Sequence, residues 1–304
     1  MSPLHALILP RLTVKHPAMT DQPAANTEQK HIIDVLIEER ARHLLTRPIA
    51  WSMIKRIIYP LLKYRTAVRM ADEIADLSAK EVLEHVSGLL DVRLNVEGTE
   101  RIPREGRFML VANHPTGIAD GVAVYDALKP VRPDMCFFAN RDALRVNPNL
   151  EEMIIPIEWV VDTRTPTKMR ELVRRMTRAF KSDNAIIMFP SGRLAIPTWR
   201  GVREQDWFGT TVNLARRHST PLLPLYMSGR NSLIYHLFHL TSAELRDMTL
   251  FNELLNKRGY LFNLTFGPMI EPDQLEGDPT EVAAKLKAYV EDDLSQDPSA
   301  AFRP

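Results

Sequence analysis

The chain has 304 residues, of which 45% are hydrophobic and 25% are charged, and both values are ordinary for a globular protein. Its 39 Lys and Arg residues balance 38 Asp and Glu residues, which argues against a dedicated nucleic-acid-binding protein. The single cysteine, Cys136, excludes an intrachain disulfide and a cysteine-based zinc site. It also fits a reducing, cytosol-facing location.

The sequence contains no apolar run of the ~20 residues needed to cross a bilayer. A short apolar run at residues 4–9 is interrupted by His5 and followed by Pro10 and Arg11. No basic segment precedes this run, so we do not interpret it as a signal peptide. These features predict a chain without a membrane-spanning helix, and they leave attachment to a membrane surface open.

The first 90 residues predict a flexible leader followed by helices. Residues 1–28 have no periodic apolar face and are expected to be poorly ordered. Residues 29–90 form a predicted helical region, with helices over 31–45, 49–64 and 80–90. Pro60 should end or kink the second of these helices.

The predicted helix at 49–64 carries an apolar stripe with basic residues beside it. The apolar positions are Trp51, Ile54, Ile57, Ile58, Leu61 and Leu62, and the basic ones are Lys55, Arg56, Lys63, Arg65 and Arg69. Such a helix can lie on a bilayer with its basic residues near anionic headgroups. It can equally pack on a globular domain with a solvated basic edge, and the pattern does not decide between the two.

From residue 91 onward, short apolar runs alternate with helical patterns. The predicted strands are 92–96, 108–112, 135–139, 157–161, 185–189, 222–226 and 261–266. The predicted helices between them are 119–128, 167–181, 209–218 and 243–257. This alternation indicates an α/β fold with a mostly parallel sheet flanked by helices. We assign 91–275 to this domain and 276–304 to a C-terminal helix (279–294) and tail.

The first chemically informative segment is Asn113-His-Pro-Thr-Gly-Ile-Ala-Asp-Gly121, directly after a predicted strand. Ligands of parallel α/β sheets bind at the carboxyl ends of strands. The turn can bring the Asp120 carboxylate to the His114 ring, where it would fix the tautomer and raise the basicity of the other nitrogen. The alternative is an ordinary turn histidine followed by a capping aspartate.

A second segment, Phe189-Pro-Ser-Gly-Arg193, also follows a predicted strand. A glycine turn there can expose backbone N–H groups to an anion, and Arg193 can pair with a phosphate or carboxylate. The alternative is a plain turn with a solvated arginine.

Together these segments resemble the glycerolipid (lysophosphatidic acid-type) acyltransferases over about residues 90–275. The 113–121 segment resembles their first block, and 189–193 resembles their Phe-Pro-Glu-Gly-Thr-Arg block. Residues 160–164 and 220–226 match a basic acceptor-binding segment and a later apolar strand. Residues 228–232 and 255–259 resemble a bacterial subgroup that includes lyso-ornithine-lipid and hemolysin-like acyltransferases.

The chain departs from the family pattern in two places. Five residues instead of four separate His114 from Asp120, as in the bacterial subgroup. Ser191 replaces the glutamate of the later block, and Arg193 lies one position earlier than the usual arginine. These departures weaken any inference about the acceptor headgroup.

The resemblance implies an O-acyltransferase that works at the cytoplasmic face of the cell membrane as a peripheral protein. His114 would remove the proton of an acceptor hydroxyl as it attacks an acyl thioester carried on CoA or acyl carrier protein, and Asp120 would orient His114. The acceptor would be a lysolipid or a glycerol-phosphate-like molecule, and no metal or bound cofactor is required. The rival expectations are an acyl thioesterase and a non-catalytic lipid-binding protein.

Further roles follow from the same resemblance. Backbone N–H groups near Ser191 and Gly192 would hold the acceptor or the oxyanion. Arg164 and Arg193 would bind the acceptor's polar head, and Asn113 would set the turn. The implied substrate-binding residues are Asn113, Gly117, Arg164, Pro190, Ser191, Gly192 and Arg193.

Overall fold

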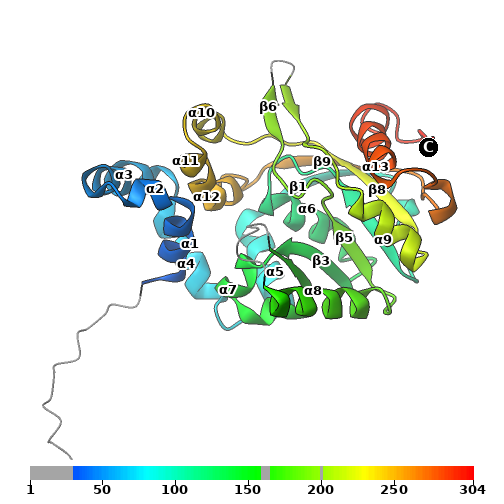
Figure 1. Cartoon of the computed structure of the whole chain (residues 1–304), viewed down its shortest axis with the longest axis horizontal. Helices are drawn as coiled ribbons and strands as arrows, with labels where there is room; N and C mark the ends of the chain where they lie inside the picture. Colours follow the sequence, from blue (N-terminus) through cyan, green and yellow to red (C-terminus); the bar gives the residue numbers. More distant parts are fainter. Residues whose placement is uncertain (1–29, 159–164, 199–200) are drawn as a thin grey trace, which may run out of the picture. The chain divides into compact units, whose positions relative to one another are not determined.

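The computed structural model describes residues 30–158, 165–198 and 201–304. The predicted leader at 1–28 and the 160–164 segment lie outside the described residues. From His31 to Pro304 the chain folds as one unit (Figure 1).

A seven-stranded sheet forms the centre of the structure, in the order β1-β9-β8-β2-β5-β3-β4. The five strands from β8 to β4 are parallel, whereas β9 is antiparallel to β8 and parallel to β1. This confirms the predicted mostly parallel α/β sheet. The strands are β1 (Arg93–Glu97), β2 (Phe108–Ala112), β3 (Met135–Asn140), β4 (Ile154–Ile157), β5 (Ala185–Met188), β8 (Leu222–Met227) and β9 (Leu261–Phe266).

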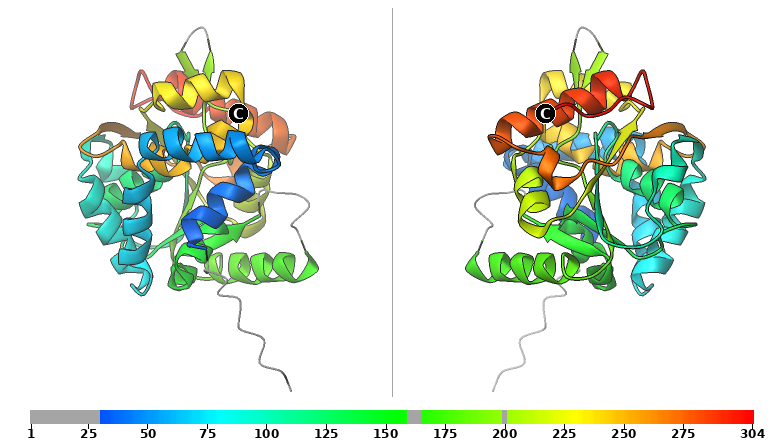
Figure 2. Two further views of the ribbon diagram at one scale, coloured as in Figure 1. Left: turned by 90° about the vertical axis from the view of Figure 1, so that its left-hand side faces the viewer. Right: turned by 90° about the vertical axis from the view of Figure 1, so that its right-hand side faces the viewer.

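The central strand β2 is buried along its whole length because helices cover both faces of the sheet. Phe108 and Leu110 face a core shared with the N-terminal helices, while Met109 and Val111 face a second core. Figure 2 shows these two helical layers on opposite sides of the strands. Burying each such side chain contributes roughly 1.5–3 kcal/mol. The sheet is therefore a rigid base for the loops at its edge.

One helical layer joins the N-terminal region to the sheet, and the other is formed mainly by α8, α9 and α13. The N-terminal helices are α1 (Ile32–Arg40), α2 (Arg42–Leu45), α3 (Pro48–Leu61), α4 (Tyr64–Ile74) and α5 (Ala79–Leu90). The later helices are α6 (Ile118–Leu128), α7 (Asp142–Val146), α8 (Pro166–Ala179), α9 (Thr210–His218), α10 (Leu233–Thr241), α11 (Ala243–Met248), α12 (Leu250–Leu255) and α13 (Pro279–Ala288).

Several helix boundaries differ from the sequence prediction. The predicted helix at 31–45 is broken at Ala41, and α3 ends at Leu61, one residue after Pro60, which has no backbone N–H to donate. Lys63 adopts a left-handed conformation with φ of 55°, which starts α4, a helix the sequence did not indicate. The predicted helix at 243–257 is two helices, α11 and α12, separated at Thr249.

Three further elements were not expected. The short helix α7 follows β3, a small antiparallel hairpin, β6 (Ile196–Thr198) and β7 (Gly201–Arg203), follows β5, and α10 follows β8. Among the residues that the structure describes, no helix is long and apolar enough to cross a membrane.

Candidate active site

Two neighbouring strands deliver the motif residues to the same edge of the sheet. Because β2 pairs with β5 in parallel, the segments that follow Ala112 and Met188 leave the sheet side by side. The ring of His114 stacks on that of Phe189, with centroids 4.2 Å apart and an interplanar angle of 25°. The two motifs therefore meet at the carboxyl edge of the sheet, where parallel α/β proteins bind ligands.

The spacing of His114 and Asp120 brings their side chains into contact. His114 Nδ1 lies 3.0 Å from Asp120 Oδ2, at ion-pair distance but off the line of a hydrogen bond. The histidine side chain is 19% exposed and the aspartate is fully buried. Since Nδ1 faces the carboxylate, Nε2 is the nitrogen left to exchange a proton with a substrate.

Asp120 is held by the turn that precedes it. Its carboxylate accepts hydrogen bonds from Thr116 N at 2.8 Å, Thr116 Oγ1 at 2.5 Å and Gly117 N at 2.9 Å. It lies in the first turn of α6, where the helix dipole favours a negative charge. These contacts fix the carboxylate against the histidine ring.

Gly117 makes this turn possible. Its backbone has φ of 90° and ψ of −132°, a conformation that residues other than glycine rarely adopt. A Cβ at this position would lie 2.7 Å from Leu194 Cδ2. Gly117 therefore serves the geometry of the turn and donates its N–H to Asp120.

The backbone of His114 is held on both sides by the segment that follows β5. The Ala195 N–H donates to His114 O at 3.1 Å, and His114 N donates to Glu204 Oε2 at 3.0 Å. The hairpin β6–β7 separates these two partners in the sequence. The hairpin connection thus brings a second carboxylate to the histidine.

Glu204 is the main site residue that sequence reasoning missed. Only 3% of it is exposed, and burial raises the pKa of its carboxyl to about 7. Its Oε1 atom has no hydrogen-bond partner among the described residues, while its backbone N–H donates to Glu291 Oε1 at 2.9 Å. A glutamate in a polar stretch carries no sequence signal that would link it to a histidine 90 residues away.

Asn113 links β2 to β8. Its Nδ2 donates to Met227 O at 2.8 Å, and its Oδ1 accepts from Met227 N at 2.7 Å. Because both ends of the amide are used in this way, the geometry favours the turn-setting role over the substrate-binding role.

The 190–193 turn is tighter than the sequence suggested. The Gly192 N–H donates to Phe189 O at 2.9 Å, so it closes the turn and is not the open donor expected for an oxyanion. Ser191 is buried, and its Oγ donates to Arg193 O at 2.9 Å. Pro190 is buried and its carbonyl accepts from Phe208 N, while Arg193 is exposed beside the turn. Arg164 lies outside the described residues.

The chain is similar to known lipid acyltransferases. Residues 93–228 match the Acyltransferase family, a span that includes His114, Asp120 and the 189–193 turn. The chain is 29% identical over 219 residues to a lyso-glycine lipid O-acyltransferase of Phocaeicola vulgatus, covering 70% of this chain and 76% of that protein. It is 26% identical over 227 residues to one of Bacteroides thetaiotaomicron, covering 73% and 81%.

Among solved structures, the chain is similar to the 1-acyl-sn-glycerophosphate acyltransferase PlsC of Thermotoga maritima. The identity is 14% and the TM-score 0.45, over 88% of this chain and 97% of that one.

Proposed function

We propose that this chain is a lipid O-acyltransferase of the glycerolipid acyltransferase superfamily and that His114 is its general base. His114 Nε2 takes the proton of the acceptor hydroxyl as its oxygen attacks the thioester carbonyl. The C–S bond then breaks, the thiolate leaves with a proton returned from the imidazolium, and an ester forms. Asp120 keeps the ring oriented and offsets its charge while it is protonated.

The observation that carries this proposal is the contact of 3.0 Å between His114 Nδ1 and Asp120 Oδ2 at the carboxyl edge of the sheet. The buried carboxylate is fixed by three hydrogen bonds, and the ring is partly exposed to an incoming hydroxyl. A group that is held in place before the reaction accelerates it without further ordering. The thioester is already an activated donor, so the mechanism calls for no metal or bound cofactor.

For the acceptor, we propose a lysolipid of the lyso-glycine lipid kind. The two relatives named for that acceptor match at 29% and 26% identity. The donor is an acyl thioester of CoA or acyl carrier protein.

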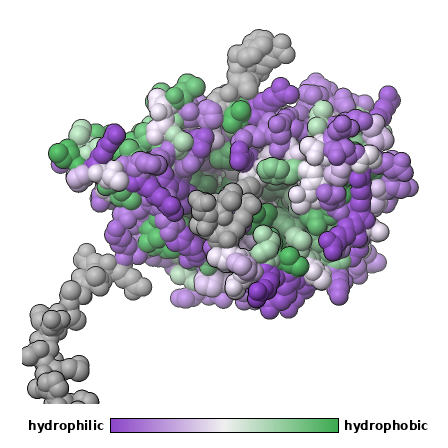
Figure 3. Space-filling view, in the orientation of Figure 1, coloured by the Kyte–Doolittle hydropathy of each residue, from purple (hydrophilic) through white to green (hydrophobic). Residues whose placement is uncertain are grey.

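We also propose that the enzyme works as a peripheral protein at the cytoplasmic membrane surface. One side of α3 packs inward through Trp51 and Tyr59, and the other is exposed and apolar. Its exposed residues, spaced four apart, are Ile49, Met53, Ile57 and Leu61, between 51% and 80% accessible. Exposed Lys55 and Arg56 lie on the same helix, and Figure 3 shows apolar side chains gathered over α3 and α10. This arrangement suits an anionic bilayer surface.

The direct test incubates the purified protein with labelled acyl-CoA or acyl carrier protein and a panel of acceptors. The panel contains lyso-glycine lipid, lyso-ornithine lipid and lysophosphatidic acid, and products are identified by mass spectrometry. We expect a diacylated lipid, with the rate lowered about 10²–10⁴-fold in His114→Ala. Release of free fatty acid without an acceptor would indicate a thioesterase instead. Lipid binding by both proteins without any turnover would indicate a binding protein.

A further inference from the structure

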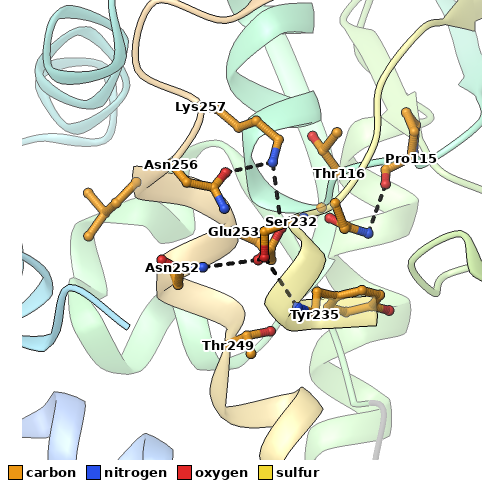
Figure 4. Close-up of polar contacts among 12 residues, drawn as sticks. Pro115, Thr116, Ser232, Tyr235, Thr249, Asn252, Glu253, Asn256 and Lys257 are labelled. Atoms are coloured by element: carbon orange, nitrogen blue, oxygen red, sulfur yellow. Dashed lines mark hydrogen bonds and ion pairs between the residues drawn. The ribbon is translucent and has the colours of Figure 1, made fainter. Parts of the chain in front are cut away.

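A buried polar network lies behind the His114–Asp120 turn and is not part of the mechanism above. It is formed by the end of α12 with the residues after it, and by the loop 228–232 that joins β8 to α10. Figure 4 shows it running from Lys257 and Asn256 through Glu253 to Ser232. The 228–232 loop, with Asn256 and Lys257, belongs to the two segments that resemble the bacterial subgroup, 228–232 and 255–259.

The 228–232 loop packs directly against the catalytic turn. A Cβ on Gly229 would lie 2.6 Å from Thr116 Cγ2 and 3.1 Å from Pro115 Cγ, so only glycine fits there without displacement. Asn231 Nδ2 donates to Pro115 O at 3.0 Å. Thr116 in turn donates two hydrogen bonds to Asp120. The loop therefore contacts the turn that holds the carboxylate beside His114.

Glu253 holds the loop to α12. It is 1% exposed, and its carboxylate accepts from Ser232 N at 2.8 Å, Ser232 Oγ at 2.5 Å and Asn252 Nδ2 at 3.1 Å. Ser232 also caps α10 by accepting from Tyr235 N. The carboxylate is thus the common acceptor of the network.

Lys257 supplies the positive charge. It is 3% exposed, and its Nζ lies 3.5 Å from Glu253 Oε2 and donates to Asn256 Oδ1 at 2.6 Å. Burial lowers the pKa of Lys257, and the negative charges of Glu253 and Asp120 oppose that shift. The ammonium therefore pairs with the carboxylate that holds the 228–232 loop against the turn of Asp120.

We propose that Lys257 and Glu253 are positioning residues that set the buried charge behind the catalytic pair. With neutral His114, the three ionised groups Asp120, Glu253 and Lys257 sum to one negative charge, and a proton on His114 brings the total to zero. The single net negative charge stabilises the imidazolium of His114, and before proton transfer the site carries no more than that one charge. This inference rests on the proposed role of His114 as general base.

Other ionisable groups lie around this network, among them His236 on α10, whose pKa is lowered by burial while the charge of Glu253 opposes that shift. Glu204 contacts the His114 backbone, with Glu291 beyond it, and Lys63 repels Lys257 from the side of α4. None of these is changed in the variants below. A purely structural role, in which Glu253 and Lys257 only fasten α12 to α10, predicts lower stability and no change in the pH profile.

The test measures kcat/KM against pH for Lys257→Met, Glu253→Gln and the double variant. Loss of the positive charge favours the imidazolium. In Lys257→Met the fall of kcat/KM on the acidic side of the pH profile should therefore move to higher pH, by about one unit. Glu253→Gln should move this fall of kcat/KM to lower pH. In the double variant it should lie close to its position in the wild type. Opposite shifts that cancel are not expected from loss of packing.

A matched control is Arg132→Met, which removes another buried cation from the opposite edge of the sheet, where it binds Pro103 O, Gly106 O and Asp134. Arg132→Met should lower stability and leave the pH profile of kcat/KM unchanged. If Lys257→Met does not fold, Glu253→Gln and the double variant still decide the question. Unshifted pH profiles in folded variants would overturn this inference. Full activity in His114→Ala would instead overturn the proposed function.

Discussion

The carboxylate of Glu204 accepts a hydrogen bond of 3.0 Å from the backbone N–H of His114, 90 residues earlier in the chain. The Ala195 N–H holds the carbonyl of the same histidine. Both partners come from the segment after β5, on either side of the β6–β7 hairpin. The hairpin is thus part of the frame that fixes the backbone of His114.

Glu204 should make the stability of the protein depend on pH. Its pKa is raised from 4.5 to about 7 by burial, so the folded state binds this proton more tightly than the unfolded state. The stability gained from the protonated carboxyl is complete below about pH 4.5 and is lost as the pH rises through about 7. The loss amounts to about 3 kcal/mol. Urea unfolding at intervals between pH 5 and 8 measures it.

In Glu204→Gln this part of the pH dependence should disappear. Plotted against pH between 5 and 8, the free energy of unfolding should therefore have different slopes in the wild type and the variant. The control is Glu105→Gln, an exposed glutamate before β2, which should keep the wild-type slope. Parallel curves for wild type and Glu204→Gln would show that Glu204 does not titrate in this range.

Asp120→Asn should impair both the reaction and the fold. The amide offers one oxygen where the carboxylate accepts three hydrogen bonds, and it removes the negative charge beside His114. We expect kcat to fall about 10²-fold or more and stability to fall by about 1–3 kcal/mol. Steady-state kinetics and denaturant unfolding of the same preparation separate the two effects. An unchanged kcat would argue against the His–Asp mechanism.

Gly117→Ala should distort the catalytic turn. A methyl group would lie 2.7 Å from Leu194, and the φ of 90° is strained for any residue with a Cβ. The expected cost is about 1–3 kcal/mol, together with a lower kcat because Asp120 loses its position. Thermal unfolding and the transfer assay measure the two consequences.

Gly88→Ala is the matched control for this substitution. Gly88 lies inside α5, and a Cβ there would meet nothing within 4 Å. The same chemical change should therefore stabilise the protein by about 0.5–1 kcal/mol and leave activity unchanged. If both variants behaved alike, the turn geometry would not be the cause.

The sequence predicted the parts of the fold that depend on local pattern. The apolar runs at β2 and β5 are buried strands, and their ends meet as expected for parallel neighbours. Of the strand predicted at 157–161, residues 159–161 lie outside the described residues, and β4 runs from Ile154 to Ile157 and contains Pro156. Proline is tolerated there since β4 is an edge strand, which needs hydrogen bonds on one side only.

The site was predictable only where its residues lie close together in sequence. His114 and Asp120 are six residues apart, and the turn between them dictates their contact. Glu204 reaches His114 because the hairpin packs there, and Glu253 on α12 and Lys257 just after it lie behind the turn through tertiary packing. No periodicity or spacing in a single sequence encodes such distances, although the 228–232 and 255–259 segments did stand out as resemblances.

The exposed apolar faces predict how the enzyme meets its lipid substrates. Ile57 on α3 and Leu237 on α10 are 63% and 58% exposed. Replacing either with glutamate should weaken binding to anionic phosphatidylglycerol vesicles about tenfold, because an apolar contact is lost and a repulsive charge is gained. Co-sedimentation with vesicles measures the affinity, and the basic contribution of Lys55 and Arg56 should appear as weaker binding at high salt.

The control for this prediction is Val173→Glu on α8, which replaces an apolar residue of similar exposure, 49%, on a different helix. It should bind vesicles as the wild type does, because the proposed contact is confined to α3 and α10. Transfer to a lysolipid dispersed in detergent should be the same in all three variants, since none of the substitutions touches the His114–Asp120 turn. Equal loss of vesicle binding in all three would mean that charge alone, and not these two helices, governs attachment.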